Sequence, residues 1–222
     1  MTRVDRIFVG GIAPLPPEGH PSGIFKQAVD APVLLGAEGL AGDAQADRRV
    51  HGGPFKALHH YAAENYALLR EAFPEKADLF VPGSLGENVS TTGWDEATVC
   101  IGDVFRIGCA TVQVSQPRQP CWKINHKFGA DDLMRFVAER CVAGWYYRVL
   151  EDGEIAAGEA FELIERNAAP VTLRRLWFAQ REHRPDPAEL TRLRDTPGLS
   201  PNWVQKLDER IAWLRRQAEQ TR

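Results

Sequence analysis

The stretch from Ser115 to Lys127 (SQPRQPCWKINHK) places a single cysteine among four side chains that are or can be cationic. No Asp or Glu occurs between Val104 and Ala130. Cationic neighbours lower the pKa of a thiol, and the thiolate is the form that attacks electrophiles or ligates soft metals. Pro117 and Pro120 exclude a helix or a central strand running through the segment, so we expect a stiff loop that presents Cys121.

Cys121 has a second interpretation, as a buried structural cysteine in a proline-rich connection. Free cysteine is among the most buried residue types, which favours that interpretation for a cysteine considered alone. The reactive interpretation is favoured by the flanking cations Arg118, Lys123 and Lys127. The local sequence leaves both open and makes this loop the first candidate for function.

Another basic run without acids, from Arg48 to Tyr61, carries the paired glycines Gly52 and Gly53. Glycine turns let the backbone approach a ligand closely, and successive N–H groups there can form an anion-binding nest. Apolar residues recur at helical spacing from Lys56 to Phe73, which predicts a helix that begins near Pro54 and favours an anion at its N-terminus. The histidines of the run lack a partner at metal-site spacing, so we expect hydrogen bonding, substrate contact or packing from His51, His59 and His60.

The composition is that of an ordinary soluble globular protein, with 222 residues, 44% of them hydrophobic and 26% charged. No apolar run approaches the roughly 20 residues that span a bilayer, and the N-terminus lacks a secretory core, so we expect a cytoplasmic protein without membrane contact. The four cysteines should then be thiols, and their spacing contains no Cys-x-x-Cys pair that would favour structural zinc. A basic stretch inside an acidic body indicates a local anion site rather than a nucleic-acid surface.

Strand signals are spread through residues 1–166, which we expect to form one domain. They lie at Arg3–Val9, Gly23–Val29, Ala97–Ser115, Trp145–Leu150 and Glu154–Ile164. The last two flank Asp152-Gly153, which suits a type I′ turn and predicts a hairpin. A short helix is expected at Asp131–Cys141, with Cys141 in the core. The pattern predicts a mainly β domain with peripheral helices (α+β), built as an antiparallel barrel or sandwich.

Residues 167–222 are predicted to form a small domain of three helices. The helices are expected at Val171–Gln180, Asp186–Asp195 and Ser200–Gln217. Asp186 with Pro187 and Glu189 provides a cap, a first-turn proline and a capping-box acid. A helical unit of this size is marginal alone, so we expect it to pack on the main domain or on a second subunit.

Five motifs occur in order along the chain: Gly42-Asp43, Gln45–Gly53, Gly86–Asn88, Ser115–Lys123 and Gly144–Leu150. Together with the three-helix tail, this combination resembles the MOSC domain family, and in particular its YiiM-like members. The resemblance covers nearly the whole chain. It implies a β-barrel domain that binds the molybdopterin form of molybdenum cofactor and takes part in reductive detoxification of N-hydroxylated compounds, including hydroxylaminopurine base analogues.

The resemblance also implies site residues. The family's cysteine corresponds to Cys121, as metal ligand and catalytic residue, and Arg49 and Lys26 are expected to act with it. The residues expected to hold the cofactor are Arg48, His51, Gly52, Gly53, Lys56, His59, Asn88, Gln116, Arg118 and Lys123. Some members carry Asp after the paired glycines, where this chain has Phe55.

The implied partners are a small N-hydroxylated substrate, a separate electron-donor reductase or flavoprotein, and a second copy of the chain in a homodimer. The donor must be separate because no segment resembles a flavin, nicotinamide or iron–sulfur site. Trp122 beside Arg118 and Lys123 could stack on nucleic acid, but one aromatic residue is too few for stable binding.

The residues leave open two alternatives to a molybdenum-dependent reductase. In the first, Cys121 holds cofactor or persulfide sulfur and passes it on without turnover. In the second, Cys121 is the nucleophile of a hydrolase with a histidine base, although no third orienting group is evident. The candidate bases are His51, His59 and His126.

Overall fold

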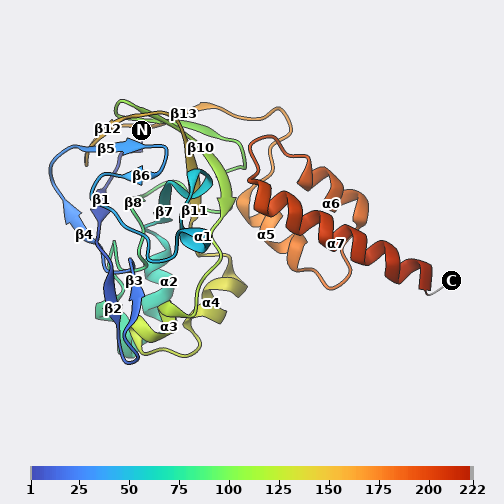
Figure 1. Cartoon of the computed structure of the whole chain (residues 1–222), viewed down its shortest axis with the longest axis horizontal. Coiled ribbons are helices and arrows are strands. Elements are labelled where there is room, and N and C mark those ends of the chain that lie inside the picture. The colour runs from blue at the N-terminus through green and yellow to red at the C-terminus, as the bar shows by residue number, and fades with distance from the viewer. Residues whose placement is uncertain (1, 221–222) are drawn as a thin grey trace.

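The protein is described here by a computed structural model covering residues 2–220. Figure 1 shows a sheet domain with a helical tail beside it. The main sheet has the order β13-β9-β10-β11-β7-β8-β1-β4, and only its β7–β8 pair is parallel. Its strands are β1 (Arg6–Val9), β4 (Gln27–Val29), β7 (Leu58–Ala62), β8 (Val89–Thr91), β9 (Val104–Ile107), β10 (Ala110–Pro117), β11 (Trp145–Glu151) and β13 (Phe161–Glu165).

The main sheet is open, so the predicted closed barrel is wrong. Its two edge strands are β4 and β13, which are not neighbours in the described sheet. Closure would require the first and last strands to pair along their length, and β4 has only three residues. Two small sheets complete the domain: β2 (Ala13–Leu15) with β3 (His20–Ser22), and β12 (Gly153–Ile155) with β5 (Val33–Gly36) and β6 (Gly39–Leu40).

The predicted helix from Lys56 to Phe73 is wrong in its first part and confirmed in its second. Pro54–Lys56 forms a single 3-10 turn, residues 58–62 form the central strand β7, and a helix, α2, covers only Asn65–Ala72. All five residues of β7 are buried, because β11 and β8 flank the strand and side chains cover both of its faces. A strand buried on both faces has no polar alternation, which is why its sequence is compatible with a helix.

The predicted hairpin is wrong in its pairing, although its strands exist. Strand β11 pairs with β10 and β7, whereas β12 pairs with β5 and β13 pairs with β9. Asp152 therefore stands between strands of different sheets. The turn chemistry was local, but the choice of strand partner depends on residues more than a hundred positions away.

The loop expected around Cys121 is shorter than predicted. Strand β10 continues to Pro117, which pairs with Trp145, and helix α3 (Lys123–Phe128) begins two residues after the cysteine. A proline is tolerated at this strand end because β9 accompanies β10 only as far as Gln113. The predicted following helix is confirmed as α4 (Leu133–Arg140), and Cys141 is buried behind it.

The three tail helices are confirmed as α5 (Leu173–Arg181), α6 (Pro187–Arg194) and α7 (Pro201–Gln220). Asp186 caps α6 by accepting a hydrogen bond from the Ala188 N–H at 2.9 Å, whereas Glu189 pairs with Arg175 instead of closing a capping box. The remaining short helices are α1 (Arg48–His51) and the 3-10 segment Pro74–Leu79. No helix within residues 2–220 has the length and apolar character needed to cross a membrane.

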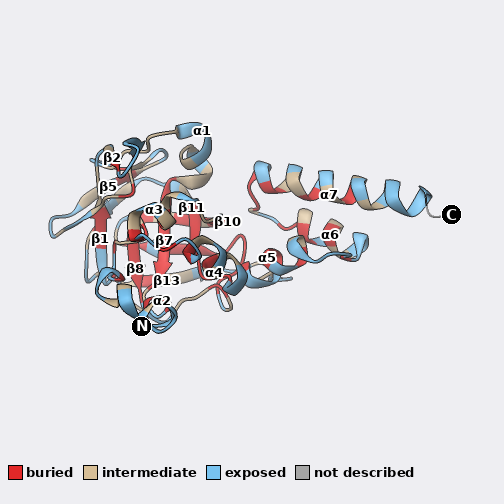
Figure 2. Cartoon of the chain, turned by 90° about the horizontal axis from the view of Figure 1, so that it is seen from below, coloured by how far each residue is buried: buried red, intermediate tan, exposed pale blue. Residues whose placement is uncertain are grey.

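The tail shares a hydrophobic core with the sheet. Trp177 of α5 and Trp203 of α7 are buried in the same cluster as Trp145 and Tyr147 of β11. The Trp177 indole N–H donates to the Ala138 carbonyl at 2.8 Å, which ties α5 to the end of α4. Figure 2 shows the buried residues on the sheet and the inner sides of the helices, while the far end of α7 is exposed. The first turn of α7 is thereby held beside the end of β10.

Candidate functional site: a thiol beside unpaired cations

A cavity of about 90 Å³ lies where the segments after β10 and around β4 approach each other. We call it the thiol cavity, because Cys121 lines it. Eight of the expected residues line it together: Lys26, His51, Lys56, His59, Asn88, Arg118, Cys121 and Lys123. These residues come from four separate stretches of the sequence, at 26, 51–59, 88 and 118–123, and the fold brings them together around one cavity.

Cys121 differs from the other three cysteines in its surroundings. It is half-buried at the start of α3, where its carbonyl accepts the Ile124 N–H at 3.1 Å. Cys100 and Cys141 are buried, and burial raises the pKa of Cys141 to about 12, so that group stays a neutral thiol. Cys109 is exposed but lines neither this cavity nor its neighbour. Cys121 is therefore the described cysteine placed to meet a ligand.

Arg118 provides a fixed positive charge in the wall of the cavity. Its side chain is buried, and the guanidinium donates to the carbonyl oxygens of Ala143 at 3.3 Å and Leu85 at 3.1 Å. Carbonyl groups hold the guanidinium in place without cancelling its charge. No carboxylate within residues 2–220 forms an ion pair with Arg118. The charge also helps to lower the pKa of His51, after the larger effect of burial.

Lys26 lies in the same wall, but its charge is compensated. Its ammonium is 2.6 Å from an Asp43 carboxylate oxygen, and both side chains are almost fully buried. Asp43 also accepts from the Gly10 N–H at 3.0 Å and from the Asn88 amide at 2.9 Å. Burial lowers the pKa of Lys26, and the Asp43 charge opposes that shift. The pair fixes three chain segments around the cavity.

The neutral members of the wall are tied to the same network. His59 is buried, its ring nitrogens lie 3.2 Å from the Gly86 carbonyl and 3.3 Å from the Ala143 carbonyl, and burial lowers its pKa well below the usual value. The side-chain oxygen of Asn88 accepts a hydrogen bond from the His59 backbone N–H at 3.1 Å. His59 is thus a neutral structural group, as one of the sequence-based interpretations expected.

The remaining expected residues lie elsewhere. Arg48 forms an ion pair with Glu38 on the surface, and Arg49 pairs with Asp47 at 3.0 Å with its side chain 90% exposed. Gly52 and Gly53 line neither cavity. Arg49 and Gln116 line a neighbouring cavity of about 280 Å³, which we call the second cavity.

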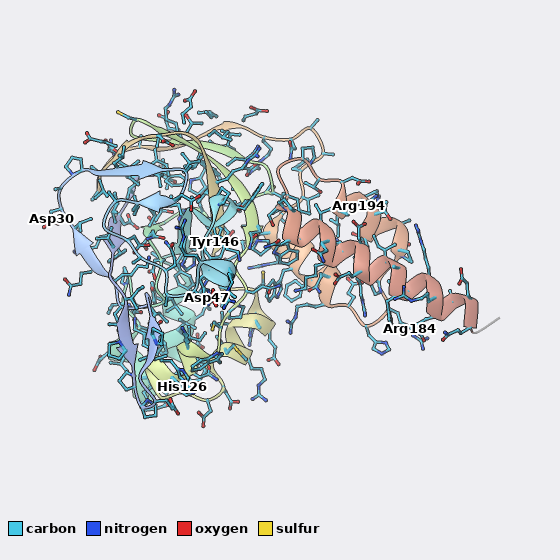
Figure 3. All side chains as sticks on the ribbon, viewed as in Figure 1. Asp30, Asp47, His126, Tyr146, Arg184 and Arg194 are labelled. Carbon is cyan, nitrogen blue, oxygen red and sulfur yellow. The ribbon has the colours of Figure 1, made fainter. Side chains whose placement is uncertain are left out.

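The lining residues that were not named as site residues from the sequence include Asp43, Gln45 and Tyr146 in the thiol cavity, and Asn202 and Lys206 of α7 in the second. Tyr146, labelled in Figure 3, lines both cavities and comes from β11. Asp43 lies within a quoted motif, but its pairing with Lys26 needs the tertiary structure. The two α7 residues carry no local signal, because they look like an ordinary solvated helix surface.

The described side chains do not make a complete metal site. Within residues 2–220, no three His, Cys, Asp or Glu side chains converge in a way that could hold a metal ion. A metal bound at Cys121 would therefore have to bring its other ligands with it. A metal already chelated by an anionic organic group fits a cavity that offers one soft sulfur ligand and several cations.

The structure defines this protein as an open mixed sheet with a helical tail and a cationic cavity that presents a thiol. Comparison with known proteins finds relatives of the same kind. The MOSC domain model matches residues 47–162. Protein YiiM of Escherichia coli is 42% identical over 195 residues, which cover 87% of this chain and 86% of that protein. The crystal structure of E. coli YiiM superposes with a TM-score of 0.80, at 33% identity, over 95% of this chain and 92% of that one.

The chain therefore belongs to the MOSC domain family. That family is associated with binding of molybdenum cofactor. A protein of Gibberella moniliformis named "Reductase" is also similar, with 38% identity over 146 residues that cover 65% of this chain and 26% of that protein.

Proposed function

We propose that this protein is a molybdenum-cofactor-dependent reductase of N-hydroxylated compounds, such as hydroxylaminopurine base analogues, with Cys121 as metal ligand. The observation that carries the proposal is a half-buried cysteine facing a cavity whose arginine has no carboxylate partner among the described residues. Molybdenum cofactor brings dithiolene sulfurs and a phosphate, so it requires one further soft ligand and cationic groups. The relative named "Reductase" supports the redox class.

The cations of the thiol cavity can stabilise negative charge on a bound ligand. Arg118 is held by two carbonyl oxygens, so its charge is in place before a ligand arrives. Lys123 is anchored in a similar way, since its ammonium donates to the Pro21 carbonyl at 2.7 Å. Preorganised charges of this kind stabilise negative charge that develops on a bound substrate without a reorganisation cost.

Reduction of an N–OH group to N–H consumes two electrons and two protons and releases water. When bound, the cofactor would supply the two electrons that reduce the N–O bond. Protons have to come from the cavity, and Lys56 is its candidate donor. Burial lowers the pKa of Lys56, which brings the ammonium closer to the range where it can release a proton. Burial and nearby cations lower the pKa of His51, which favours the neutral imidazole and makes His51 a poor donor. The electron donor is a separate reductase or flavoprotein.

Turnover by protein purified from a host that makes the cofactor tests the proposal. Reduced viologen supplies electrons, and 6-hydroxylaminopurine is the substrate. We expect turnover that is lost in Cys121→Ala and retained in Cys109→Ala, which removes an exposed cysteine outside both cavities.

Absence of turnover at full molybdenum loading would refute the reductase and favour a carrier. A carrier would show a persulfide or retained cofactor on Cys121, detectable by mass spectrometry of the intact protein, and would transfer it to a second protein. The two outcomes are distinguishable because only the reductase consumes viologen electrons in proportion to substrate.

A further inference from the structure

The second cavity lies between the end of β10, the segment around α1, and the first turns of α7. Its volume of about 280 Å³ exceeds the 90 Å³ of the thiol cavity. The two share His51, Lys56 and Tyr146, so they are adjacent. Among residues 2–220, no Asp or Glu contributes to the lining of the second cavity.

Two half-buried ammonium groups in this lining lack a carboxylate partner. Lys56 donates to the Val50 carbonyl oxygen, and Lys206 lies over the Trp203 ring at 5.3 Å. Neither forms an ion pair in the described chain. Partly desolvated cations without a counter-charge are costly, and an anion placed between them recovers that cost. The Arg49 side chain is exposed and forms an ion pair with Asp47, so it adds little net positive charge to the cavity.

A buried polar group in the same lining also lacks a partner. The side-chain oxygen of Gln116 is inaccessible to solvent and has no hydrogen-bond partner, and the residue is only 4% exposed. Buried amide oxygens are normally satisfied, so an orphaned one at a cavity indicates a missing donor. An amino or hydroxyl group on the organic part of a ligand would supply it, because a fully ionised phosphate has no proton to donate. The first turn of α7, with Asn202, adds the positive end of a helix dipole.

We propose that the second cavity binds a phosphomonoester dianion between Lys56 and Lys206, so that α7 of the tail takes part in ligand recognition. A phosphomonoester offers two negative charges and several acceptor oxygens, which suit two ammonium groups and a helix N-terminus. Such a group occurs at the end of a substrate nucleotide and on the pterin of molybdenum cofactor. The nucleotide interpretation rests on the proposed function, because its base would have to reach Cys121.

Isothermal titration of cofactor-free protein with adenosine 5′-monophosphate, adenosine and inorganic phosphate tests the site. We expect the monophosphate to bind at least about tenfold more tightly than adenosine, and Lys206→Gln to weaken it about tenfold, equivalent to ~1.4 kcal/mol. Arg216→Gln is the matched control, since it removes one charge from an exposed position on the same helix and should leave binding unchanged. Lys206→Arg should retain most of the affinity.

The source of the phosphate follows from repeating the titration with cofactor-loaded protein. Loss of monophosphate binding assigns the site to the cofactor, and retention assigns it to a nucleotide substrate. Equal binding by wild type and Lys206→Gln, or no binding of either phosphate compound by the cofactor-free protein, would overturn the proposal. Because these titrations do not require turnover, phosphate binding without reductase activity would refute the proposed function and leave this site standing.

Discussion

Replacement of Asp43 by Asn should be one of the most destabilising single changes in the sheet domain. The substitution leaves the Lys26 ammonium, 6% exposed, without its counter-charge. It also places an amide where the carboxylate accepted hydrogen bonds from Gly10 and Asn88. Removal of one partner from a buried ion pair costs about 3–5 kcal/mol. In a chain of this length, that corresponds to a fall in Tm of about 6–20 °C.

Differential scanning calorimetry of the cofactor-free variants measures this effect. Asp47→Asn is the matched control, because its pair with Arg49 is exposed and such pairs contribute about 0–1 kcal/mol. Asn also preserves the cap that Asp47 provides to α1. Adding Lys26→Met to Asp43→Asn should recover part of the loss, since no uncompensated charge then remains.

The pH dependence gives an independent check on Asp43→Asn. The pKa of Lys26 is already lowered by burial, and loss of Asp43 removes the charge that opposes this shift. A lysine whose folded pKa lies below its unfolded value makes the fold more stable as pH rises toward the unfolded value. The penalty should therefore shrink at alkaline pH. A loss below about 1 kcal/mol at neutral pH, or a penalty that grows with pH, would refute the reasoning about a buried pair.

Three further predictions follow from single residues. Burial lowers the pKa of Lys127 from 10.5 to about 8, so the unfolding free energy of the wild type should rise between pH 8 and 10.5. Lys127→Met should flatten that rise. Urea unfolding at several pH values measures it, and a variant whose unfolding free energy rises with pH as steeply as that of the wild type would contradict the prediction. Gly144→Ala should destabilise more than Gly158→Ala: both glycines have positive φ, which costs about 1–2 kcal/mol for alanine, but a Cβ at 144 would lie 2.2 Å from a carbonyl oxygen, and equal Tm values would exclude that clash. Iodoacetamide should modify Cys121 and spare Cys141, whose pKa is raised to about 12, and bound cofactor should protect Cys121; peptide mapping that finds the reverse order would contradict an accessible Cys121 thiol.

The sequence predicted the tail better than the sheet because helix signals are local. Asp186 and Pro187 mark the start of α6 within a few residues, and the structure confirms that helix. Strand pairing is a long-range property. Strand β12 joins β5 instead of its neighbour in sequence, and no turn residue near Asp152 encodes that choice.

The site shows the same division between local and long-range information. The cationic surroundings of Cys121 could be predicted because Arg118 and Lys123 lie within three residues of it. The compensation of Lys26 by Asp43 could not, because the two residues come from loops 17 positions apart that only the tertiary structure brings together. The contribution of Lys206 depends on how the tail packs against the sheet, and no pattern in the sequence predicts that packing.

Molybdenum K-edge X-ray absorption of protein purified from a cofactor-producing host tests the central claim most directly. We expect wild type and Cys109→Ala to give the same sulfur coordination, and Cys121→Ser to show one sulfur ligand fewer or no bound molybdenum. Molybdenum bound to Cys121→Ser with an unchanged number of sulfur ligands would contradict the assignment of Cys121 as metal ligand.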